Sequence, residues 1–132
     1  MCTGRRSPVY FHAEHRMIPW LREIDPFPIV EIHPQVADSI GVNDGEWIYI
    51  ENDRGRIKRK AKVTPTIHPK VIMVPHGWWL PEEKGSAPEF YGIWDLNVNN
   101  LIPVGTQSKS GYGGGAYKTI LCRVAKIKGG DK

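Results

Sequence analysis

Proline and glycine are spread along most of this chain, and their spacing limits the folds available to it. Eleven prolines and fourteen glycines occur among 132 residues, roughly half as many again as average usage would give. Each proline removes a backbone donor and disfavours helix at the residue before it. Few stretches between Pro8 and Pro103 can therefore hold a helix of three turns. The sequence predicts a mainly β protein with short helices.

The size and composition are those of one ordinary globular domain. With 40% hydrophobic and 24% charged residues, the chain can bury a core, and wholesale disorder is excluded. No apolar run approaches the ~18 residues of a membrane helix, so we expect no membrane contact. Arg5 and Arg6 are followed by no apolar signal region, so we expect no export signal in the chain itself.

The first half of the chain contains residues that typically begin and end helices and form turns. Pro34 at a first helical position, with His33 before it and Gly41 after Ile40, predicts a short capped helix. The turn residues 53–55 follow an aromatic, β-branched run and predict a hairpin. The remaining expected elements are strands over Ser7–His12, Ile29–Ile32 and Val71–Val74, a short helix over Arg16–Glu23, and a long final strand over Tyr117–Ile127.

The second arm of the hairpin alternates between apolar and basic residues. Ile57, Ala61 and Val63 share one face, which Arg59 interrupts, and the other face carries lysine and arginine. That alternation is typical of a strand with one face in water. Residues 75–116 show almost no periodicity, and so long an irregular segment usually lines or packs under something. We expect the domain to span residues 1–128 and the polar tail 129–132 to fray.

The chain lacks the common catalytic and metal-binding patterns. Cys2 and Cys122 form no CxxC pair. The segment His12–His15 places its histidines three apart, whereas the zinc-protease motif needs them four apart on a helix. The glycine run 111–115 matches no phosphate-binding signature. We therefore predict no catalytic residue and no metal ligand.

Polar and cationic groups instead gather where strands are expected to end, beside glycines. They are Thr3-Gly4-Arg5, His12 and Arg16, His76-Gly77-Trp78, residues 97–100, and Tyr117-Lys118. If a barrel brings these ends together, one rim carries amides, cations and close backbone donors. That inventory, with a net charge of +4, suits a large, anionic cofactor rich in heteroatoms.

Six motifs in order resemble a known family over nearly the whole chain. They are TGR at 3–5, HxxxR at 12–16, VEIHPQVADSIGVNDGEWIYIENDRGRI at 30–57, PHGWW at 75–79, NVNNL at 97–101 and YKTILCRV at 117–124. The chain resembles the C-terminal molybdopterin dinucleotide-binding domain of the dimethyl sulfoxide reductase family of molybdenum and tungsten oxidoreductases. The resemblance implies a double-psi β-barrel, the aspartate decarboxylase-like barrel, that caps a longer catalytic chain.

The resemblance also implies what this domain binds. The cofactor would be molybdopterin guanine dinucleotide, present as a pair (bis-MGD), whose dithiolene sulfurs hold molybdenum or tungsten. The partners would be the remaining domains or the catalytic subunit of a molybdopterin oxidoreductase, and the domain would not be catalytic alone. The chain would be cytoplasmic, or periplasmic if the parent enzyme is exported.

The family's motifs assign roles residue by residue. The resemblance implies that Thr3 and Arg5 contact the pyrophosphate or pterin, that Gly4 allows close backbone approach, and that His12 and Arg16 reach the same charged region. It further implies cofactor contacts from His76, Asn97, Asn99 and Lys118, with the two asparagines on pterin or guanine edges. His33 stands at a helix cap where relatives often have Asn.

Three alternatives stay open at this point. The chain could be a stand-alone small protein that resembles the D subunit of formylmethanofuran dehydrogenase. An aspartate decarboxylase-like enzyme shares the barrel and would cleave itself at a Gly-Ser pair, here Gly85-Ser86. A basic β-barrel that binds nucleic acid would use the face from Arg54 to Lys62, although such lysine-rich faces are more often solvated edges.

Overall fold

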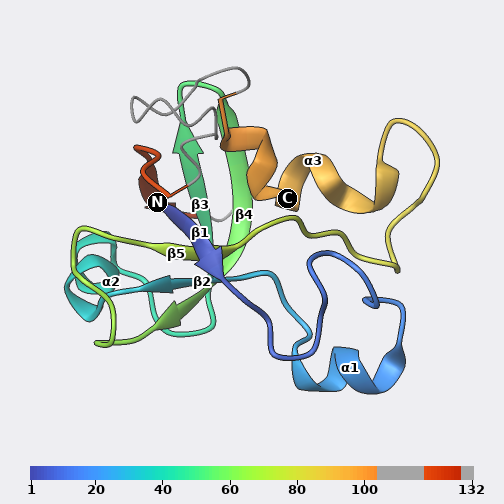
Figure 1. Cartoon of the computed structure of the whole chain (residues 1–132). Coiled ribbons are helices and arrows are strands. Elements are labelled where there is room, and N and C mark those ends of the chain that lie inside the picture. Colours follow the sequence, from blue (N-terminus) through green and yellow to red (C-terminus); the bar gives the residue numbers. More distant parts are fainter. Residues whose placement is uncertain (104–117, 129–132) are drawn as a thin grey trace, which may run out of the picture.

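The computed structural model describes residues 1–103 and 118–128, which form a six-stranded mixed sheet flanked by short helices (Figure 1). The strands are β1 (Cys2–Arg5), β2 (Ile29–Ile32), β3 (Trp47–Asn52), β4 (Gly55–Val63), β5 (Met73–Pro75) and β6 (Arg123–Lys126). The helices are α1 (Pro19–Ile24), α2 (Pro34–Ile40) and α3 (Ile93–Leu96), with 3-10 turns η1 (Phe90–Gly92) and η2 (Val98–Leu101). The prediction of a mainly β protein with short helices is confirmed.

The sheet brings together segments that are far apart in the sequence. Its strand order is β1-β5-β2-β4-β3-β6. The pairs β1·β5 and β2·β4 are parallel, whereas β2·β5, β3·β4 and β3·β6 are antiparallel. Gly4 and Arg5 at the end of β1 both lie opposite Pro75 at the end of β5. This pairing places the TGR segment beside the segment that follows Pro75.

The capped helix forms as His33, Pro34 and Gly41 predict. Pro34 occupies the start of α2, and Nδ1 of His33 accepts a 3.2 Å hydrogen bond from the backbone N–H of Gln35. Gly41 ends the helix at φ 66°, a left-handed conformation that glycine adopts without steric cost. The helix therefore begins and ends at the residues expected from the sequence.

The hairpin β3–β4 supplies the centre of the core. Ile57, Arg59 and Ala61 of β4 are buried, and the residues between them are more exposed, as expected for a strand with one wet face. Arg59 is the exception in this otherwise apolar row. The main cluster of buried residues contains Val30, Ile32, Ala37, Val42, Ile48, Ile50, Ile57, Ala61, Ile72, Val74, Val98 and Leu101.

A second, smaller core lies under the irregular segments. It contains Tyr10, Trp78 and Leu96. The expected strand over Ser7–His12 does not form, and that prediction is wrong. The Tyr10 hydroxyl donates to the backbone oxygen of Asp25 at 2.9 Å, and the Tyr10 ring meets Trp78 edge-on. His12 has φ 54°, so the chain turns there because side-chain packing outweighs β propensity.

The final strand is shorter than expected. β6 covers Arg123–Lys126 and pairs with β3, and residues 118–122 belong to no strand. The backbone N–H of Ile120 nevertheless donates to the Met1 carbonyl at 3.2 Å. Tyr117, the glycine run 111–115 and the tail 129–132 lie outside the described residues. Within residues 1–103 and 118–128, no helix is long and apolar enough to cross a bilayer.

Candidate functional site

The TGR segment ends β1 beside β5. The Nε of Arg5 donates to Oε1 of Glu31 at 3.0 Å, and the Arg5 Nη1 is buried without a hydrogen-bond partner. A Cβ added to Gly4 would lie 3.2 Å from the Cys2 sulfur, so this strand end has little room for a larger residue. Arg5 therefore retains unused donor capacity next to Pro75.

His12 and His76 meet at this strand end. Their Nδ1 and Nε2 atoms are 2.5 Å apart, and Nη1 of Arg6 lies 3.4 Å from the same Nδ1 of His12. Burial lowers the pKa of His76, and the charges of His12, Arg6 and Arg16 lower it further. The ring pair can hold its hydrogen bond only while one nitrogen donates and the other accepts.

Arg16 is almost completely buried behind the histidines. Its Nη2 donates to the backbone oxygen of His12 at 3.2 Å, and its guanidinium lies 3.5 Å from the Trp78 ring centroid and 4.6 Å from that of Tyr10. Its Nε and Nη1 have no hydrogen-bond partner. Burial lowers the pKa of Arg16 to about 10, so the side chain stays cationic at neutral pH.

The residue that the sequence did not assign to the site is Arg59. Its side chain is fully buried, and its Nη2 donates to the Gly77 carbonyl at 2.8 Å. Its Nε and Nη1 have no partner, and its guanidinium lies 5.7 Å from the Trp78 ring centroid. The available signal was the interruption of the apolar face of the hairpin by an arginine.

These side chains form what we call the arginine–histidine cluster: Arg5, Arg6, His12, Arg16, Arg59 and His76. Among the described residues, the carboxylate that pairs with the cluster is Glu31, through Arg5. The nearby Asp25 accepts from the Ser7 hydroxyl instead, at 2.6 Å. Buried donors without acceptors are rare in folded proteins. An anionic group with several acceptor oxygens, such as a pyrophosphate, fits this surplus of cationic donors.

The asparagine motif and Lys118 lie outside this cluster. The Oδ1 of Asn97 accepts from the backbone N–H of Asn99 at 2.9 Å and caps η2. Asn100 donates to the carbonyls of Ile93 and Trp94. Asn99 and Lys118 are exposed. The structure thus gathers Arg5, His12, Arg16 and His76, together with the TGR backbone, and uses Asn97 within its own turn.

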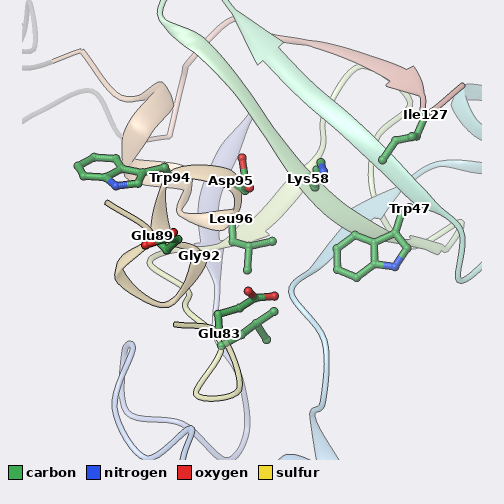
Figure 2. A pocket seen from close by; sticks show the side chains of 10 residues that line it. Trp47, Lys58, Glu83, Glu89, Gly92, Trp94, Asp95, Leu96 and Ile127 are labelled. Atoms are coloured by element: carbon green, nitrogen blue, oxygen red, sulfur yellow. The ribbon is translucent and has the colours of Figure 1, made fainter. Parts of the chain in front are cut away.

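A separate cleft has a different chemistry. It has a volume of about 490 Å³ and is lined by Trp47, Lys58, Leu80, Glu83, Glu89, Gly92, Trp94, Asp95, Leu96 and Ile127. Figure 2 shows Trp47 and Ile127 on one side and Leu96 and Glu83 facing them. None of the predicted site residues lines it, and its three carboxylates oppose an anionic ligand.

Two side chains of the basic face of β4 make contacts within the chain. Arg56 lies 4.1 Å from the Tyr49 ring centroid, and Nζ of Lys60 lies 3.6 Å from that of Phe27. These cation–π contacts hold two of the basic side chains against the protein. The face therefore offers little support for a nucleic-acid interface. Within the part of the chain that the structure describes, no three His, Cys, Asp or Glu side chains form a metal-binding group.

Comparisons with known proteins identify the family of the chain. A family model described as "Molydopterin dinucleotide binding domain" matches residues 1–120. The "Dopamine dehydroxylase" of Eggerthella lenta is 44% identical over 100 residues, covering 76% of this chain and 10% of that protein. A putative dimethyl sulfoxide reductase catalytic chain of Halobacterium salinarum is 40% identical over 128 residues, covering 97% of this chain and 14% of that protein.

A solved structure shares the fold. Acetylene hydratase from Pelobacter acetylenicus superposes with a TM-score of 0.82 at 28% identity, covering 94% of this chain and 18% of that one. The mixed six-stranded sheet with short helices is consistent with that neighbour. The chain spans between 10% and 14% of the length of the two curated relatives.

Proposed function

This chain belongs to the molybdopterin dinucleotide-binding domain family, with relatives among the dimethyl sulfoxide reductase family of molybdenum oxidoreductases, and we propose that its arginine–histidine cluster binds the anionic part of the cofactor. The observation that carries the proposal is the positive charge of this strand end, where Arg5 and Arg16 keep unpartnered donors and, among the described residues, Glu31 is the carboxylate that pairs with the cluster. Phosphate oxygens are strong acceptors that pair well with planar guanidinium groups.

Each side chain has a separate task in this proposal. Arg5 offers its free Nη1 to a phosphate or pterin oxygen while Glu31 fixes its Nε. Arg16 supplies buried positive charge from the face of Trp78. His12 and His76 form the exposed edge of the cluster, where a ring N–H can donate to an anion. Thr3 and Gly4 present the backbone of β1, and Asn97, Asn99 and Lys118 are proposed as outer contacts.

The chemistry of the reaction belongs to the cofactor. When bound, a molybdopterin dinucleotide supplies a metal held by dithiolene sulfurs, which carries out the electron transfer. The residues of this chain bind and orient the cofactor and compensate its negative charge. We propose that the chain is not catalytic alone.

We further propose that the chain is one domain, spanning residues 1–128, of a larger molybdopterin oxidoreductase. The chain covers only 10% and 14% of the length of two relatives, and this supports a domain of a larger protein over a stand-alone small protein. The exposed apolar side chains Met17, Trp20 and Ile24 on and before α1 also support it, because such a surface is usually covered by a partner. The partner is the remainder of that enzyme.

A finer fold assignment follows from the same relationship. We propose that the six strands form the double-psi barrel that the family resemblance implies. The parallel pairs β1·β5 and β2·β4, each between strands that are not consecutive, support it.

The binding proposal is tested by cofactor retention in the purified full-length protein. The variants are Arg5→Gln and Arg16→Gln, and the matched control is Arg56→Gln, an exposed arginine on the hairpin. Nucleotide and metal released on denaturation are quantified per protein chain. Loss of a charge-assisted contact worth about 1.5–3 kcal/mol weakens binding roughly tenfold or more, so both variants should lose cofactor. Retention equal to that of the control in both variants refutes the assignment.

A further inference from the structure

Arg59 is a buried cation that no carboxylate of the described residues neutralises. It is 0% exposed, and no ion pair among the described residues includes it. Burial lowers the pKa of Arg59 to about 9, and the charge of Arg16 contributes to that shift, yet the group stays protonated at neutral pH. Burying an unpaired charge is costly. An apolar residue between Ile57 and Ala61 would have filled this position at less cost.

The interactions of Arg59 point to one short segment, residues 76–79. Its Nη2 holds the Gly77 carbonyl at 2.8 Å, and its guanidinium lies beside the Trp78 ring. Gly77 has φ 65° and Trp78 has φ 125°. The second angle is strained for a bulky residue such as tryptophan and persists only where surrounding contacts impose it. The hydrogen bond from Arg59 is one such contact.

The same segment arranges two side chains of the arginine–histidine cluster. His76, at its start, meets His12. Trp78 carries the guanidinium of Arg16 on its ring, 3.5 Å from the centroid. Arg59 is too deeply buried to reach a ligand itself, so any effect it has on binding passes through this segment.

We propose that Arg59 is a positioning residue of the cofactor site: by holding the Gly77 carbonyl, it fixes the strained backbone of residues 76–79 and thereby the places of His76 and Arg16. This inference rests on the proposed function of the cluster. It also explains why a long cationic side chain occupies an apolar row, since this side chain reaches the Gly77 carbonyl from β4.

The test separates positioning from a general contribution to stability. Arg59→Met keeps an extended side chain, removes the charge and loses the hydrogen bond. Because replacing a buried charge by an apolar residue is often neutral or stabilising, this variant is expected to fold with unchanged or higher thermal stability. If Arg59 contributed only to stability, a variant that folds well would leave the conformation of His76 unchanged.

Two measurements are made: one of the conformation of residues 76–79 and one of cofactor binding. In the 132-residue chain, NMR contacts between the rings of His12 and His76 and the indole N–H signal of Trp78 report the conformation of residues 76–79. In the full-length protein, nucleotide and metal content report cofactor binding. For Arg59→Met we expect the ring contacts to be lost and cofactor binding to weaken about tenfold, as for loss of a supporting outer contact. Arg59→Lys, which keeps a cationic donor, should restore both, and Arg56→Met should change neither.

An Arg59→Met chain with intact ring contacts and normal cofactor content overturns the proposal. If Arg59→Met does not fold, Arg59→Gln takes its place, and failure of both to fold also overturns it by making Arg59 a residue of the fold alone. If Arg5→Gln and Arg16→Gln retain cofactor, the proposed function fails, whereas the NMR contacts in the 132-residue chain still test whether Arg59 positions residues 76–79.

Discussion

The rings of His12 and His76 stand 64 positions apart in the sequence, yet Nδ1 of the first lies 2.5 Å from Nε2 of the second. The contact ties the turn after Phe11 to the segment that follows β5. A hydrogen bond between two ring nitrogens uses one proton, and a second proton would place two donors face to face. Arg6 and Arg16 add positive charge around the pair. The link between these two segments therefore depends on pH.

The first prediction concerns stability against pH. Burial, followed by the charges of His12, Arg6 and Arg16, lowers the folded-state pKa of His76 below its ordinary value of 6.5. As pH falls through 6.5, the unfolded chain gains a proton at this residue before the folded chain does, so the free energy of unfolding decreases. Urea denaturation between pH 8 and the acid side of 6.5 measures the slope. His76→Gln should flatten it, and identical slopes in the two proteins would contradict the prediction.

The second prediction concerns the cap of α2. His33→Ala removes the ring nitrogen that accepts from the backbone N–H of Gln35, and loss of such a cap typically costs about 1 kcal/mol. His33→Asn should retain most of the stability, because asparagine is a preferred cap. Chemical denaturation of both variants at neutral pH gives the comparison. Equal losses in the two variants would show that the ring contributes by packing.

The third prediction uses one substitution at two positions of opposite burial. Ile32 is fully buried in the main core, whereas Ile24 at the end of α1 is 64% exposed. Ile32→Ala should lower the free energy of unfolding by about 2–5 kcal/mol through lost burial and the cavity left behind. Ile24→Ala should change it by no more than about 0.5 kcal/mol. Denaturant unfolding of the 132-residue chain measures both, and a large loss at Ile24 would place α1 in the core.

Helix-capping and turn residues made much of the fold predictable from the sequence. Pro34 and Gly41 mark both ends of α2, and the turn at Asp53 marks the hairpin, because these signals act within a few residues. The strand expected over Ser7–His12 failed because Tyr10 is buried against Trp78, a distant residue in the sequence. The β propensity of the segment carries no information about that partner.

The site, too, was predictable from the sequence in part. The family motifs singled out Arg5, His12, Arg16 and His76, and these residues do come together. The cofactor contacts of all the predicted site residues stay predictions. In the sequence, Arg59 stood out only because it interrupts an apolar row. The alternation of a strand predicts which side chains are buried but not which groups they hydrogen-bond. Its partner, the Gly77 carbonyl, is set by the packing of β4 against a segment with no regular structure.

The last prediction concerns the face that the proposed partner, the remainder of a larger enzyme, would cover. α1 contains no buried residue and stands apart from the sheet in Figure 1. Met17 and Trp20 are 60% and 64% exposed. His12 and Arg16 of the proposed cofactor site lie in the same stretch of chain, so a domain that shares the cofactor would approach this face.

Hydrogen exchange in the 132-residue chain and in the proposed full-length enzyme distinguishes a covered face from a free one. Peptides covering Met17 to Ile24 should exchange more slowly in the full-length enzyme, whereas α2, with its own caps, serves as the internal reference. Trp20→Gln should leave the free energy of unfolding of the 132-residue chain within about 0.5 kcal/mol but lower the thermal stability of the full-length enzyme, because a polar amide would then be buried in an apolar contact. Equal exchange of the α1 peptides in both proteins, with no effect of Trp20→Gln in either, would place the partner on another face.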